Sequence, residues 1–171
     1  MTPKVYRSGP VGALMDEYER AAREYKQLIS SISQEDFIKI IDPDTKDPDC
    51  VSVQTITNHV VRAGFGYANY IRRQFNDPQT ERKEDYELTD TGKAIREIDN
   101  MLNYTIETLN NKWDMPFEEI TKNVIETRWE QKYDFDQLLE HAIVHILRHR
   151  RQIERLMKQG SMKKMRGEAM P

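Results

Sequence analysis

Residues 138–156, LLEHAIVHILRHRRQIERL, constrain the fold more than any other stretch, because they combine an apolar pattern with a histidine at every fourth position. An α-helix turns about 100° per residue, so this spacing stacks the three histidines along one side of a helix. Relative to Leu138, His149 falls at about 20°, His145 at about −20° and His141 at about −60°. The apolar arc, from about 0° to 100°, holds Leu138, Leu156, Ala142, Ile153, Ile146 and Leu139. The stretch therefore predicts an amphipathic helix with His145 and His149 facing inward and His141 at the rim.

The fourth histidine, His59, lies in a second helical pattern, VSVQTITNHVVRAGFGYANYIRR. It occupies the same edge of its own apolar arc, which contains Ile56, Val60 and Ala63. If the two helices face each other, His59, His145 and His149 can converge on one point. Three imidazoles suit Zn, Ni or Fe and leave a position for water or substrate, as in catalytic rather than closed structural sites. The alternative is that the histidines are hydrogen-bonded core residues without a metal.

The rest of the chain also predicts helices, so the expected fold class is all-α. Residues 10–32, 53–75 and 90–113 carry apolar positions at alternating spacings of three and four, and the histidine-rich helix is expected to end at Gly160. Residues 114–133 form a long crossover between the third and fourth helices, with an extended segment near residues 124–129. The chain has one domain's length, residues 1–160, followed by a mobile basic tail at residues 161–171.

Several residues near the predicted ligands could shape a site. Gly64 and Gly66 each cost a helix roughly 1 kcal/mol relative to Ala, so they should mark a close helix contact or open space. Asn58 and Gln152 could orient a ligand or a substrate. Residues that could line or guard the pocket are Tyr67, Tyr70, Arg128, Trp129, His141 and, for an anionic substrate, Arg148.

Composition excludes several classes of protein. A formal net charge of −3 and a pI near 5.9 argue against nucleic-acid binding. A single cysteine, Cys50, rules out an internal disulfide and fits a reducing cytoplasm. No apolar run reaches membrane-spanning length, and the N-terminus lacks the apolar core of a signal peptide. The acidic residues 42–50, DPDTKDPDC, lack the Gly and Glu of a calcium loop.

The run H-x-x-x-H-x-x-x-H-R-x-Q-I, from His141 to Ile153, together with a helix carrying His59, resembles the DinB-like (YfiT-like) family of metal-dependent enzymes. The resemblance implies a four-helix bundle that binds a divalent metal, often nickel or zinc. It implies the ligands His59, His145 and His149, with His141 outside the triad. The last ligand in this family commonly precedes R-G-Q, whereas Arg151 replaces the glycine here.

The resemblance also implies a class of activity. Members include transferases that act with low-molecular-weight thiols such as bacillithiol or mycothiol, and others are described as hydrolases. The expected function is therefore a thiol-linked transferase or a hydrolase of a small molecule, with the catalytic residues unidentified and a homodimer expected. The alternative is a non-catalytic bundle that binds a metal or a small molecule.

Overall fold

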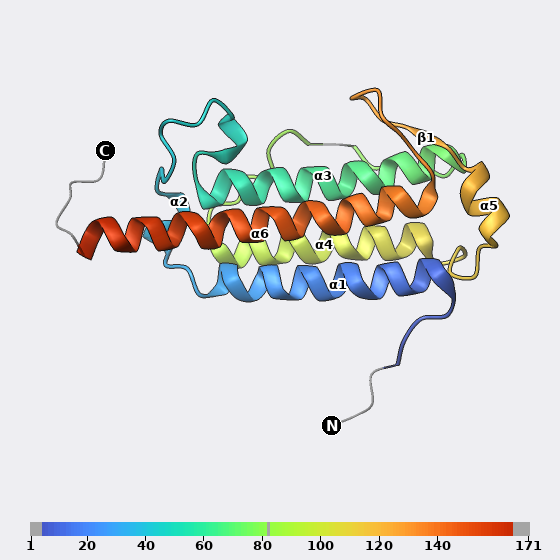
Figure 1. Ribbon diagram of the computed structural model, residues 1–171, viewed down its shortest axis with the longest axis horizontal. Coiled ribbons are helices and arrows are strands. Elements are labelled where there is room, and N and C mark those ends of the chain that lie inside the picture. The colour runs from blue at the N-terminus through green and yellow to red at the C-terminus, as the bar shows by residue number, and fades with distance from the viewer. Residues whose placement is uncertain (1–4, 82, 166–171) are drawn as a thin grey trace.

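Four long helices run side by side and make up most of the molecule (Figure 1). The computed structural model describes residues 5–81 and 83–165. The helices α1 and α4 contact each other, α3 contacts α4, and α6 contacts both α1 and α3, so each lies against two others. Their bounds are α1 Gly9–Ser30, α3 Val53–Gln74, α4 Thr91–Leu109 and α6 Phe135–Met165. The prediction of an all-α chain is confirmed.

Three of the long helices, α3, α4 and α6, begin where a side chain accepts one of the first free backbone N–H groups. Ser52 and Thr55 form a reciprocal capping box at the start of α3. Asp90 accepts from the backbone N–H of Lys93 at the start of α4. Asp134 accepts in the same way from Gln137 before α6. These local bonds mark the residue at which each of the three helices begins.

Apolar side chains from all four helices fill the space between them. On α1 the fully buried positions include Val11, Met15, Tyr25 and Ile29, whereas Leu14 and Leu28 are only partly buried. The buried stripe of α1 is broad because this helix packs on both α4 and α6. Each fully buried large side chain contributes about 1.5–3 kcal/mol to folding.

The two glycines of α3 have opposite surroundings. A Cβ on Gly64 would lie 2.4 Å from Sδ of Met101, so this glycine lets α3 approach α4 closely. A Cβ on Gly66 would meet nothing within 4 Å, so this side of α3 faces open space. Both expectations for the glycines are confirmed, and the open space belongs to the cleft described below.

Short elements cover the two ends of the long helices. One end carries α2 Gln34–Ile38 and the 3-10 helix η1 Pro48–Cys50. At the other end the crossover contains α5 Phe117–Lys122 and then an antiparallel hairpin of β1 Ile125–Glu126 and β2 Lys132–Tyr133 (Figure 1). The predicted extended segment is therefore a hairpin, and its turn holds Trp129 and Glu130, the latter at a φ of 63°.

Two predicted helix ends are wrong. The α4 helix ends at Leu109 rather than at about residue 113, and α6 continues past Gly160 to Met165. One glycine costs only about 1 kcal/mol within a helix, so it is a weak stop signal. Residues 161–165 of the expected tail therefore belong to α6, and residues 166–171 lie outside the described part of the chain. No described helix is both long and apolar enough to cross a membrane.

Candidate metal centre

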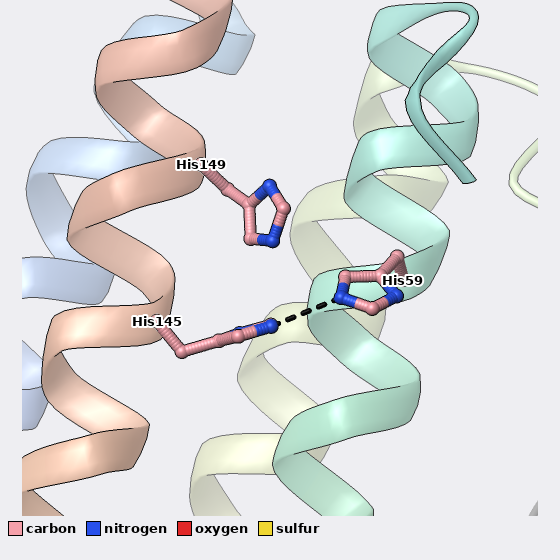
Figure 2. Close-up of side chains that lie close together, drawn as sticks. All are labelled: His59, His145 and His149. Atoms are coloured by element: carbon pink, nitrogen blue, oxygen red, sulfur yellow. Dashed lines mark hydrogen bonds between the residues drawn. The ribbon is translucent and has the colours of Figure 1, made fainter. Parts of the chain in front are cut away.

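Three histidines from two helices meet at one point between α3 and α6. Nε2 of His59 lies 2.9 Å from Nε2 of His145. The ring centroids of His59 and His149 are 4.9 Å apart, and those of His145 and His149 are 4.6 Å apart. One ring nitrogen from each histidine lies within 4.8 Å of the other two. Figure 2 shows the imidazoles of α6 pointing across the gap towards His59 on α3.

The helical register produces this convergence. His145 and His149 are one turn apart, so both project from the same side of α6. Their neighbours Ala142 and Ile146 are buried in the core, as is Val60 beside His59. The histidines thus lie at the margin of the apolar contact between α3 and α6, partly shielded from water. The predicted set His59, His145 and His149 is the one that the structure brings together.

Burial keeps the two α6 imidazoles neutral. It lowers the pKa of His145 to about 2, with further lowering from the charges that His149 and His59 would carry. Burial also lowers the pKa of His149, again helped by His59. A neutral imidazole is the form that binds a metal ion, so protons compete weakly for these two side chains near neutral pH.

A carboxylate from η1 orients the third histidine. Nδ1 of His59 lies 3.0 Å from Oδ2 of Asp49, which also forms an ion pair with Arg62. The carboxylate can only accept, so Nδ1 carries the proton and Nε2 presents its lone pair to His145 and His149. Carboxylate–histidine pairs of this kind are common behind metal ions in proteins. Asp49 was not among the predicted site residues, because residues 42–50 show only an acidic pattern without metal-ligand spacing.

Gln152 orients His149 in the same way. Nδ1 of His149 donates to Oε1 of Gln152 at 2.9 Å, so this glutamine contacts a candidate ligand. The Cys50 thiol donates to Asp47 and interacts with Gln152, and burial raises its pKa. The short helix η1 therefore supports His59 through Asp49 and places Cys50 near Gln152.

The geometry fits a divalent ion. The two Nε2 atoms of His59 and His145, 2.9 Å apart, need a proton or a cation between them. Nitrogen ligands about 2.0–2.1 Å from one ion lie about 2.9 Å apart at 90° and about 3.3 Å apart at a tetrahedral angle. Among the described residues, these histidines are the one group of three or more His, Cys, Asp or Glu side chains at metal-binding distance. Such a site offers three nitrogens and leaves further positions open.

A cleft of about 720 Å³ extends from the histidines along α3. His59, His145 and His141 line one part of it, and Arg128 and Trp129 of the hairpin line another, so the predicted position of these two residues over the pocket is confirmed. The cleft is about the size of a small-molecule site.

The remaining predicted residues lie at different distances from the centre. His141 stacks on Trp129 with ring centroids 6.0 Å apart and approaches the hydroxyl of Tyr133, outside the group of ligands. Tyr70 lines the cleft and accepts from the backbone N–H of Arg128. Burial lowers the pKa of His141, and the charge of nearby Arg148, which is itself exposed, lowers it further.

Asn58 has a different task from the expected one. Its amide donates to the carbonyl of Glu84 and accepts from the backbone N–H of Tyr86. Although adjacent to His59 in sequence, it is turned about 100° around α3 and so points at the α3–α4 connection. It anchors this loop rather than a ligand.

The fold and the site together define a helical protein with a candidate three-histidine metal centre at the head of a cleft. Comparison of the sequence with known families then gives a match to the DinB family over residues 1–165, so the chain belongs to the DinB family. No curated protein and no solved structure gives a significant match.

Proposed function

We propose that this chain is a divalent-metal-dependent enzyme of the DinB type that acts on a small molecule, as a thiol-linked transferase or as a hydrolase. The four long helices would then form the four-helix bundle of this family, with His59, His145 and His149 as the ligands of zinc, nickel or iron. The observation that carries the proposal is a set of three neutral or hydrogen-bonded imidazoles, two of which, His59 and His145, line a cleft of small-molecule size.

The protein side chains have distinct tasks in this proposal. Asp49 and Gln152 hold the proton on Nδ1 of His59 and His149, which leaves both Nε2 atoms free to bind. A divalent ion held there would supply Lewis acidity, which favours the anionic form of a thiol or a water molecule near neutral pH. A transferase and a hydrolase would both depend on this Lewis acidity, and they differ only in the nucleophile, which is a thiol in the first and water in the second.

Proton transfer would fall to other side chains that line the cleft. Burial raises the pKa of Tyr67, so its hydroxyl stays protonated and can donate a hydrogen bond. Burial lowers the pKa of His141, so this side chain is neutral and can accept a proton near the histidine centre. Glu126 also lines the cleft and carries a carboxylate that can accept a proton. The cleft thus contains both a donor and an acceptor within its walls.

The test is a reaction screen with metal-loaded and metal-stripped protein. Bacillithiol, mycothiol or glutathione would be offered with small electrophiles, and ester and amide hydrolysis would be followed in parallel. Turnover that requires the metal and is lost in His145→Ala supports an enzyme. Stoichiometric metal without turnover of any pair would instead favour the non-catalytic binding bundle.

We also infer a cytoplasmic protein that binds neither nucleic acid nor membranes and that forms a homodimer. The single cysteine and the acidic pI support the location and the absence of a nucleic-acid partner. Light scattering coupled to size exclusion tests the dimer, since a mass of one 20.3 kDa chain at micromolar concentration would contradict it.

A further inference from the structure

One wall of the cleft is aromatic and is formed by Tyr67, Tyr70 and Trp129. It begins beside the histidines, because the Tyr67 ring lies 5.8 Å from that of His145. The Trp129 ring meets Tyr70 edge-on at 5.8 Å and Tyr67 at 6.4 Å, and Trp129 remains 39% exposed. An exposed indole held by two tyrosines is a preformed surface for an apolar, flat group. All three residues line the cleft.

The neighbouring surface of the cleft is small and open. Ala63 and Gly66 lie on the same stretch of α3, and the space above Gly66 is free to 4 Å. Larger side chains at these positions would fill the cleft beside the aromatic wall. The small residues therefore keep the cleft open along α3 beside Tyr67 and Tyr70.

Two arginines, Arg73 and Arg128, give the part of the cleft beside Tyr70 a positive charge. Arg73 lies 5.0 Å from the centre of the Tyr70 ring and donates to the backbone carbonyl of Glu126, which holds its guanidinium at the cleft. Arg128 lies in the turn of the hairpin and also lines the cleft. Within the described residues neither arginine has a carboxylate at ion-pair distance, whereas Glu126 is paired with Lys132 at 4.0 Å.

Arg62 differs from these two arginines, because its charge is already neutralised. It forms ion pairs with Asp49, which also contacts His59, and with Glu84. The two lining arginines without such a pair, Arg73 and Arg128, both lie beside Tyr70 rather than beside the metal centre. An organic anion is the complementary ligand for two guanidinium groups beside an apolar surface.

We propose that the substrate of this cleft is an elongated organic anion, whose apolar part packs on the aromatic wall and whose carboxylate or phosphate binds Arg73 and Arg128. Arg73 follows His59 by fourteen residues, about 21 Å along the axis of α3, so the anionic group is remote from the reacting end. The orientation of the substrate rests on the proposed function, whereas the anion preference does not need a metal.

The experiment uses ligands that share one apolar part and differ in charge. 4-Phenylbutyrate, 4-phenylbutyl phosphate, 4-phenylbutanol and 4-phenylbutylamine would be titrated calorimetrically into metal-stripped full-length protein, so that no anion can bind a metal ion. Either anion should bind at least about tenfold more tightly than the alcohol, since a charged hydrogen bond contributes about 1.5–3 kcal/mol. The amine should bind more weakly than the alcohol.

Variants of the two arginines test whether they cause the preference for anions. Arg128→Gln and Arg73→Gln should each weaken binding of the anions by on the order of tenfold and leave the alcohol unchanged. Arg23→Gln, an exposed arginine of α1 outside the cleft, makes the same change in net charge and should have no effect. Circular dichroism checks the fold, and Arg128 is exposed enough for its variant to fold if Arg73→Gln does not.

The inference is overturned if the alcohol or the amine binds as tightly as both anions, or if the preference survives in Arg128→Gln. Its failure is separable from that of the proposed function. Loss of the anion preference with intact metal binding removes only the substrate assignment. If the protein prefers anions but binds no metal, the anion site is supported and the proposed metal-dependent activity is rejected.

Discussion

Replacing Asp49 should weaken metal binding although Asp49 itself is not a ligand. Its carboxylate lies 3.0 Å from Nδ1 of His59 and is only 28% exposed, so water replaces it poorly. Loss of such a carboxylate behind a histidine ligand typically lowers metal affinity 10–100-fold, or by about 1.4–2.7 kcal/mol. Asp49→Asn keeps an acceptor and loses the charge, so about tenfold is expected. Asp49→Ala loses both and should approach about 100-fold.

The affinity would be measured by competition with a chelator of known strength, using Zn²⁺ and Ni²⁺ separately. Asn58→Ala is the matched control, because Asn58 adjoins His59 but contacts only the α3–α4 connection. Its affinity should stay within about threefold of the parent, since it contacts no ligand. Unchanged affinity in Asp49→Ala, or an equal loss in Asn58→Ala, would refute the role given to the carboxylate.

Three further predictions follow from the same contacts. In urea unfolding, Gly64→Ala should be less stable than Gly66→Ala by about 1–3 kcal/mol, because both gain helix propensity but only the former forces a Cβ against Met101; equal stabilities would contradict the close approach. The metal-free protein should lose stability as pH falls below about 6.5, since His145 takes up a proton in the unfolded chain but not in the folded one; His145 should contribute up to about 2 kcal/mol of the loss at pH 5, so His145→Gln should lose less stability than the parent while the loss from His141 and His149 remains, and an unchanged pH dependence would contradict the burial of His145. Gln152→Ala should lower the affinity for Zn²⁺ by about tenfold or more, and an unchanged affinity by the same chelator competition would mean that the contact with His149 is incidental.

The candidate ligand set could be predicted from sequence because it depends on helical periodicity alone. His145 and His149 repeat at one turn, and His59 occupies the matching edge of its own helix, so a single assumption of facing helices brings the three together. The same angular argument places His141 at the rim, and in the structure it contacts Trp129 and Tyr133 and lies outside the group of three.

The contacts that depend on loops could not be predicted in this way. Asp49 reaches His59 because η1 folds back over the start of α3, and periodicity holds no information about that path. The hairpin that carries Trp129 was foreseen only as an extended segment, because two-residue strands have almost no sequence signal. Asn58 was assigned by adjacency in sequence, yet neighbours on a helix point in different directions.

The most direct test of the metal centre is the metal content of untagged protein and three alanine variants, measured by plasma mass spectrometry after dialysis against Zn²⁺ or Ni²⁺. The geometry predicts about one tightly bound ion per chain, lost in His59→Ala and His149→Ala and retained in His141→Ala. No bound ion in the parent protein, or an equal loss in His141→Ala, would contradict the assignment of His59, His145 and His149 as the ligands.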